Sequence, residues 1–193
     1  MYKYNWKCSR CGLCCENTIS TLAGMKFGMF LLPHEKLMFP SNVVYPLAGV
    51  GLKGKARPRP EYIFAYQNVS RPCIYYDVDL HTCRTYDNRP LVCRVFPLEA
   101  SVHGAILHRE CPEVGKMLGE GEKVLASEIG GLEQEKVALR QMQAYYYAVF
   151  IINLERYNTS RLWVYNYTQH QWLPATRDLI NKMLMKTEGE TRI

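Results

Sequence analysis

The stretch Cys8-Ser9-Arg10-Cys11-Gly12-Leu13-Cys14-Cys15 places four cysteines close together near the start of a chain of 193 residues. Two residues between cysteines let consecutive thiolates turn back toward one point, so the spacing C-x-x-C is typical of zinc knuckles and of iron–sulfur binding loops. Gly12 can adopt the positive φ that a tight loop around an ion often needs. The stretch therefore predicts a metal-binding loop, and an irregular, cysteine-rich fold around it.

A second cysteine group follows between residues 73 and 111. Buried free cysteines are the alternative for this group, because cysteine is among the most often buried residues. Nearby arginines favour metal binding instead, because arginine can donate hydrogen bonds to anionic sulfur and offset the charge of the site: Arg71, Arg84, Arg89 and Arg94. We therefore expect metal ligation by all eight cysteines: Cys8, Cys11, Cys14, Cys15, Cys73, Cys83, Cys93 and Cys111.

The first three cysteines have the spacing of a bacterial ferredoxin loop, in which a remote cysteine followed by proline completes the cluster. The single Cys-Pro pair of the chain is Cys111-Pro112. We therefore expect Cys8, Cys11, Cys14 and Cys111 to hold one centre. This pattern favours an iron–sulfur cluster, with [4Fe–4S] as the first candidate, over Zn²⁺.

Cys15 directly follows Cys14, and successive side chains of an extended stretch point to opposite sides. We therefore expect a second centre on Cys15, Cys73, Cys83 and Cys93. Three alternatives stay open: Cys73 or Cys93 in the place of Cys111, a single centre with several free cysteines, and a zinc site that includes a histidine. The histidines near the second group are His81, His103 and His108.

Composition and charge indicate one ordinary soluble domain over residues 1–193, with 48% hydrophobic and 22% charged residues. Neither a signal-peptide pattern nor an apolar run of the roughly 20 residues that cross a bilayer is seen, so we expect a cytoplasmic protein without a membrane span. The formal charge of +6 includes a basic cluster that could contact RNA or another acidic partner: Lys53, Lys55, Arg57 and Arg59.

The pattern of apolar residues predicts an α+β fold. A metal-binding half with short strands covers residues 1–112, and a mainly helical scaffold half covers residues 113–193. The expected strands are Glu61 to Tyr66, Cys73 to Tyr76 and Leu162 to Tyr167, with a hairpin of Val95 to Val102 and Ala105 to His108. The expected helices are a short one at 33–38, a long one from Leu132 to Arg156 and a last one from Thr176 to Lys186.

The cysteine pattern resembles that of the CxxCxxCC family of zinc- or iron-chelating domains. The matching residues are the first four cysteines, Cys73, Cys83 and the segment Tyr86-x-x-Arg89-Pro90-x-x-Cys93-Arg94-x-Phe96-Pro97. The resemblance spans about residues 8 to 97 and implies metal chelation. Some relatives are linked to N-methylation of flagellin lysines, which adds a role in protein modification to the alternatives.

The remaining motifs favour a non-enzymatic role. The chain has no Gly-rich phosphate loop, no C-x-x-x-C-x-x-C pattern of radical S-adenosylmethionine enzymes and no defensible catalytic triad. We expect an iron–sulfur protein that transfers electrons or senses redox state together with a protein or redox partner. The alternatives are a zinc-stabilised module that binds RNA or a ribonucleoprotein, and a component of protein lysine methylation.

Overall fold

The computed structural model describes residues 2–16, 18–22, 24–51, 60–101, 104–118, 126–146, 148 and 162–176. Strands and helices both occur along the chain, so the predicted α+β class is confirmed. By contacts the described chain forms two compact units, each built from separated stretches: 1–16 with 73–143, and 17–72 with 144–176. The division into a metal half and a scaffold half near residue 112 stays a prediction.

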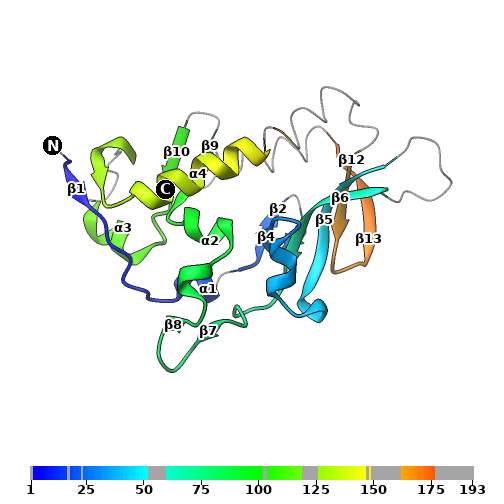
Figure 1. Ribbon diagram of the computed structural model, residues 1–193, viewed down its shortest axis with the longest axis horizontal. Helices are drawn as coiled ribbons and strands as arrows, with labels where there is room; N and C mark the ends of the chain where they lie inside the picture. The colour runs from blue at the N-terminus through cyan, green and yellow to red at the C-terminus, as the bar shows by residue number, and fades with distance from the viewer. Residues whose placement is uncertain are drawn as a thin grey trace. The chain divides into compact units, whose positions relative to one another are not determined.

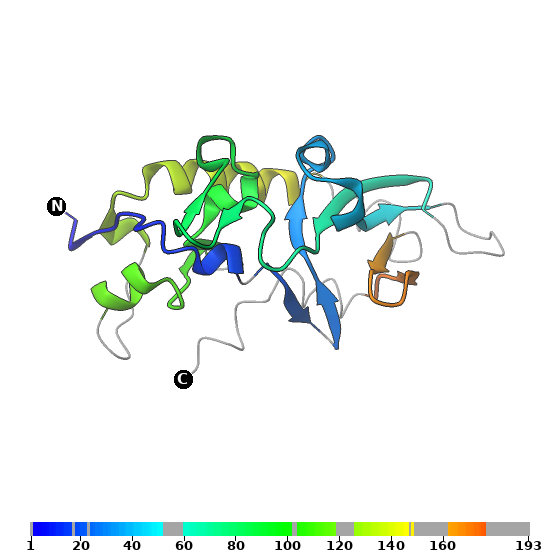
Figure 2. The ribbon, with the colours of Figure 1, turned by 90° about the horizontal axis from the view of Figure 1, so that it is seen from below.

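The first unit consists of short elements and most of one longer helix (Figures 1 and 2). Its two-stranded pairs are β1 (Tyr4–Asn5) with β11 (Ile129–Gly130), β7 (Tyr76–Asp77) with β8 (Thr82–Cys83), and β9 (Leu98–Ser101) with β10 (Gly104–Leu107). Its helices are α1 (Leu13–Glu16), η3 (Tyr86–Asn88), α2 (Leu91–Val95), α3 (Pro112–Met117), η4 (Ala126–Glu128) and most of α4 (Glu133–Tyr146).

Prolines begin two of the short helices of this unit. Pro90 precedes α2, and Pro112 is the first residue of α3, where its missing N–H has no helical acceptor to lose. Helix α4 buries an apolar stripe in the first unit, with Ala138, Leu139 and Met142 all at most 5% exposed. The predicted long helix is confirmed as far as Tyr146, and its expected continuation to Arg156 lies beyond the continuous described stretch.

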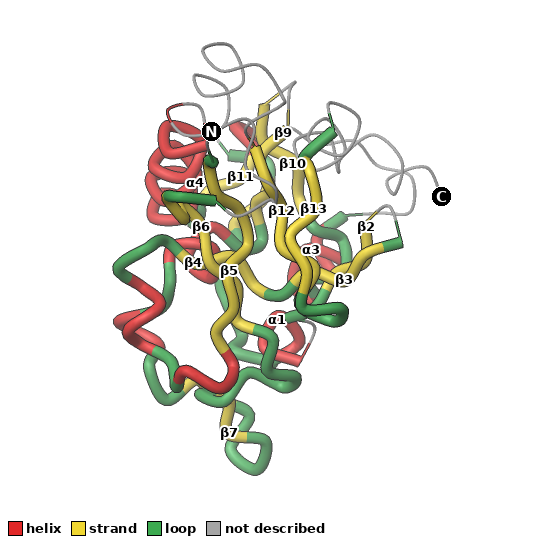
Figure 3. Tube along the Cα trace, turned by 90° about the vertical axis from the view of Figure 1, so that its right-hand side faces the viewer, coloured by secondary structure: helices red, strands yellow, loops and turns green. Residues whose placement is uncertain are grey.

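The second unit contains an antiparallel sheet of five strands in the order β13-β12-β5-β6-β4 (Figure 3). These strands are β13 (Gln171–Pro174), β12 (Leu162–Asn166), β5 (Val44–Val50), β6 (Tyr62–Asn68) and β4 (Met29–Leu31). The hairpin of β2 (Ser20–Leu22) and β3 (Met25–Phe27) and the turns η1 (Glu35–Met38) and η2 (Ser41–Val43) complete its described elements.

The side chain of Gln67, in β6, forms hydrogen bonds at an irregular point of this sheet. Pro46 cannot donate to the ladder, and the register between β5 and β6 shifts directly after it. The fully buried Gln67 side chain donates to the Pro46 carbonyl at 2.7 Å and accepts from Gly28 N at 2.8 Å. The Gln67 amide therefore satisfies backbone groups at this irregularity from inside the unit. It does so beside the apolar core of Leu31, Phe64 and Val164.

Most predicted strands are confirmed, as β6, β12 and the β9–β10 hairpin. The strand predicted at Cys73 to Tyr76 is wrong over most of its length, because Tyr76 N donates to Cys73 O and closes a turn. The short helix predicted at 33–38 is a 3-10 turn. The basic cluster at 53–59 and nearly all of the last predicted helix lie outside the described residues. No described helix is both long and apolar enough to cross a membrane.

Candidate metal centre

The first cysteines form a tight knuckle in the first unit, which contains all eight cysteines. Arg10 N donates a hydrogen bond to Cys8 Sγ at 3.4 Å, and Arg10 and Gly12 both have positive φ, of 58° and 82°. The Gly12 carbonyl then accepts from Cys15 N and Glu16 N, which begins α1. An N–H directed at sulfur is the kind of hydrogen bond that a metal-bound thiolate accepts.

The knuckle is tied to the second cysteine group through the backbone and Tyr76. Cys73 N donates to Cys15 O at 2.8 Å, and Tyr76 OH donates to Cys11 O at 3.5 Å. Tyr76 is also paired with Cys83 between β7 and β8. A side chain at Gly12 would collide with the Tyr76 ring. The chain therefore returns from residue 73 directly against the loop at residues 11–15.

Cys14 and Cys15 share the short helix α1 rather than an extended stretch. A hydrogen bond from the Cys15 thiol lowers the pKa of Cys14 to about 7, against the effect of burial and with help from the Arg89 charge. The same hydrogen bond, followed by burial, raises the pKa of Cys15. The expectation that these two side chains point to opposite sides is therefore wrong, because it assumed extended backbone.

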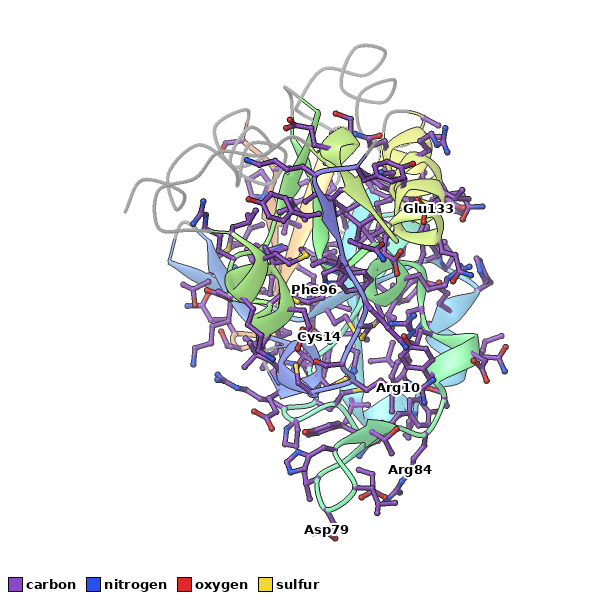
Figure 4. The ribbon with its side chains drawn as sticks, turned by 90° about the vertical axis from the view of Figure 1, so that its left-hand side faces the viewer. Arg10, Cys14, Asp79, Arg84, Phe96 and Glu133 are labelled. Atoms are coloured by element: carbon purple, nitrogen blue, oxygen red, sulfur yellow. The ribbon has the colours of Figure 1, made fainter. Side chains whose placement is uncertain are left out.

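Five thiols lie close enough to influence one another. Burial raises the pKa of Cys93, and the charges of Cys14, Cys73 and Cys83 raise it further. Burial also raises the pKa of Cys73, with smaller contributions from Cys83 and Cys14, and Cys15 is influenced by Cys73 and Cys93. We call these five the inner thiols: Cys14, Cys15, Cys73, Cys83 and Cys93. Figure 4 shows Cys14 with further sulfur atoms beside it.

The other three cysteines are Cys8 and Cys11 in the knuckle and Cys111 beside α3. Burial raises the pKa of Tyr86, and a hydrogen bond with Cys8 raises it further. Lys116 in α3 has its pKa raised first by Glu113 and then by the charges of Cys11 and Cys111, so both thiols lie near its ammonium group. Cys111 is 5% exposed and directly precedes α3. We call Cys8, Cys11 and Cys111 the outer thiols.

Among the four arginines expected beside sulfur, Arg89 lies near the thiols of Cys14 and Cys93, although its hydrogen bonds go to carbonyl oxygens. Its charge lowers the pKa of Cys14 and opposes the rise at Cys93. The guanidinium donates to the Cys93 carbonyl at 3.4 Å and to the Tyr86 carbonyl at 2.9 Å. It also lies 3.9 Å from the Tyr86 ring centre. Arg84 instead binds Asp77 at 3.0 Å with a 64% exposed side chain, so its predicted role beside sulfur is wrong.

The histidines near the second group have other neighbours. His81 Nδ1 lies 2.9 Å from Tyr76 OH, and the His108 ring is stacked 5.4 Å from that of Phe96, while His103 lies outside the described residues. Across the described ranges, no three His, Cys, Asp or Glu side chains stand together as a closed metal site. The donor set nevertheless fits zinc or iron chemically, because both metals bind thiolates and eight thiols lie in one unit.

Three comparisons with known proteins test this interpretation. The searches of curated proteins and of solved structures found no match. A family model of metal-chelating domains matches residues 7–112, which include all eight cysteines and more than half of the chain. The metal-binding role predicted from the cysteines is thus confirmed. The chain belongs to the CxxCxxCC family, whose description is "Putative zinc- or iron-chelating domain".

Proposed function

We propose that the protein holds iron–sulfur clusters, with [4Fe–4S] as the first candidate, and uses them to transfer electrons or sense redox state. The observation that carries this proposal is the gathering of five mutually interacting thiols from three separated stretches of chain: α1, the 73–83 segment and α2. One structural zinc ion takes four ligands, so the inner thiols exceed the needs of a single zinc site.

Ligand spacing also supports a cluster over zinc. Thiolates around one zinc ion each lie about 2.3 Å from it and therefore crowd together. In a cluster each thiolate binds its own iron, which separates the sulfurs. The inner thiols come from three separated stretches of chain and still influence one another, an arrangement that suits the larger group.

The ligand division expected from spacing, with Cys14 beside Cys8, Cys11 and Cys111, is one of two that this arrangement allows. The inner thiols number one more than a four-coordinate centre needs, and the outer thiols number one fewer. Cys14 and Cys15 are neighbours on α1, so either one could join Cys8, Cys11 and Cys111. The other would stay with Cys73, Cys83 and Cys93. This division gives two centres with four ligands each.

Surface position supports an electron-transfer or sensing role. Cys11 is exposed, whereas Cys73 and Cys111 are buried. A centre that spans both kinds of ligand reaches the surface, where a redox partner can approach. Arg89 adds a fixed positive charge beside Cys14 and Cys93, and such charges and hydrogen bonds raise the potential of a cluster.

The test begins with protein purified without oxygen. We expect brown protein that contains iron and acid-labile sulfide. Its absorption band in the visible range should be bleached by dithionite. Cys93→Ser should remove the inner centre and leave the outer one, while Cys111→Ser should do the reverse. Arg140→Gln, an exposed change on α4, is the matched control and should keep both. Colourless protein with stoichiometric zinc would instead support the zinc-stabilised module, for which the Arg10 N–H bond to Cys8 is equally suitable.

A further inference from the structure

A cavity of about 450 Å³ lies within the first unit, between η3, α2 and the beginning of α4. Its lining includes buried Glu135 and Ala138, half-buried Tyr86 and Arg89, and exposed Arg94 and Glu133. Figure 4 labels Glu133 at the beginning of α4. The burial pattern places Glu135 at the floor and Arg94 at the rim. The volume is in the range of small-molecule binding sites.

Glu135 is the unusual group in this cavity. Its side chain is 8% exposed, yet in the part of the chain that the structure describes no cation lies within ion-pair distance of it. It accepts a hydrogen bond from its own backbone N–H, in the first turn of α4. Burial raises its pKa, and the more distant Arg89 charge opposes that rise. A buried carboxylate without a cation is costly, so a cationic ligand would remove a real penalty.

Arg89 does not fill this role, because its guanidinium is already engaged. It donates to the Tyr86 and Cys93 carbonyls and lies on the Tyr86 ring. Those contacts hold it toward the inner thiols. The cavity therefore keeps a carboxylate at its floor that the neighbouring arginine leaves without an ion pair.

Arg94 supplies the opposite charge at the rim. Its exposed side chain has no hydrogen bond or ion pair to any residue that the structure describes. The planar guanidinium suits a carboxylate, which it can bind through two parallel hydrogen bonds. The exposed Glu133 and Asp87 add negative charge at the same rim, which favours a ligand that also carries a cation.

We propose that this cavity binds a small zwitterion of the amino-acid class, with its ammonium group at Glu135 and its carboxylate at Arg94. The site is separate from the thiols and depends on no particular metal. Its lining includes Tyr86 and Arg89, which also contact or influence the thiols, so it would place a small ligand beside the metal-binding region.

Calorimetric titration of the metal-loaded protein with the twenty proteinogenic amino acids tests the site. We expect at least one to bind, and its N-acetyl and α-amide derivatives each to bind about tenfold more weakly, since each loses one charge-assisted contact. Glu135→Gln should weaken binding of the free amino acid about tenfold. In this variant, N-acetylation of the ligand should cause no further loss of affinity. In Arg94→Gln, the amino acid and its α-amide should likewise bind with equal affinity.

Arg140→Gln, on the same helix but outside the cavity lining, should bind like the wild type. The metal content of each variant is measured alongside, so that loss of the ligand site is distinguished from loss of the metal centre. Failure of all twenty amino acids to bind would overturn the proposal. So would wild-type binding by Glu135→Gln, or equal binding of an amine that lacks a carboxylate. If Glu135→Gln fails to fold, Arg94→Gln at the exposed rim decides the outcome alone.

Discussion

At the scale of a single residue, the conformation of the knuckle depends on Gly12. Its φ of 82° lies in the left-handed region, and the Tyr76 ring occupies the space where a Cβ would stand. Position 12 therefore requires glycine for two separate reasons, the left-handed backbone and the space that the Tyr76 ring occupies. Gly24 offers a natural comparison, because its φ of 77° is similar but nothing lies within 4 Å of its Cβ position.

Gly12→Ala should therefore cost more than Gly24→Ala. Left-handed backbone alone costs alanine about 1–2 kcal/mol, which is what we expect at Gly24. At Gly12 the displaced Tyr76 ring adds to this, for a total loss of about 2–4 kcal/mol in the free energy of unfolding. Urea denaturation of both variants measures the difference, and metal content should fall only in Gly12→Ala. Equal losses in the two variants would show that the contact with Tyr76 is unimportant.

Residue identity made the knuckle predictable, whereas the directions of its side chains were not. The C-x-x-C spacing and Gly12 pointed to a knuckle, and both the positive φ and the N–H bond to sulfur are present. The relation of Cys14 to Cys15 depended on whether four residues were helical or extended. A segment that short has no usable periodicity, because a helix repeats only every 3.6 residues. Only the hydrogen bonds to Gly12 O decide it.

Long elements with a clear pattern were predictable at the next scale. Helix α4 and strands β6 and β12 follow their apolar periodicity, whereas the turn at Cys73 was missed because aromatic residues there resembled a strand. The cavity was not predictable, because Tyr86, Arg94 and Glu135 come together only through tertiary packing. Glu135 had no local signal, since an acidic residue in the first turn of a helix is ordinary.

Tyr145 near the end of α4 provides a test at this scale, within the second unit. Its hydroxyl donates to the Phe64 carbonyl in β6, its ring meets Phe30 edge-on at 6.2 Å, and burial raises its pKa to about 12. The unfolded value is about 10. Because the folded pKa is higher, the stabilisation is complete below pH 10 and is lost as pH rises toward 12.

Tyr145→Phe should lose about 1 kcal/mol at neutral pH, from the hydrogen bond to Phe64. The gap between wild type and variant should then narrow as pH rises from 10 to 12. Thermal or urea unfolding at several pH values measures it, and the other tyrosines cancel in the difference. A gap that stays constant to pH 12 would mean that Tyr145 is not shielded from water.

At the scale of the whole molecule, metal binding and the sheet belong to different compact units. All eight cysteines lie in the unit of residues 1–16 and 73–143, whose elements, apart from α4, are short and irregular. The five-stranded sheet lies in the other unit, with its own buried residues such as Leu31, Phe64 and Val164. A bound metal stabilises the folded form of the unit that supplies its ligands.

Removing the metal should therefore loosen the two units unequally. We expect amide hydrogen exchange to accelerate across the knuckle, the 73–95 segment and α3, and to stay nearly unchanged in β5, β6 and β12. The physical reason is that short helices and two-stranded pairs bury little apolar surface, whereas a five-stranded sheet with a closed core is stable by itself. Exchange is measured by mass spectrometry on loaded, chelated and reconstituted protein, and reconstitution should restore the slow rates. Equal acceleration in both units would contradict this, since it would mean that the metal stabilises the sheet as much as the unit that holds the cysteines.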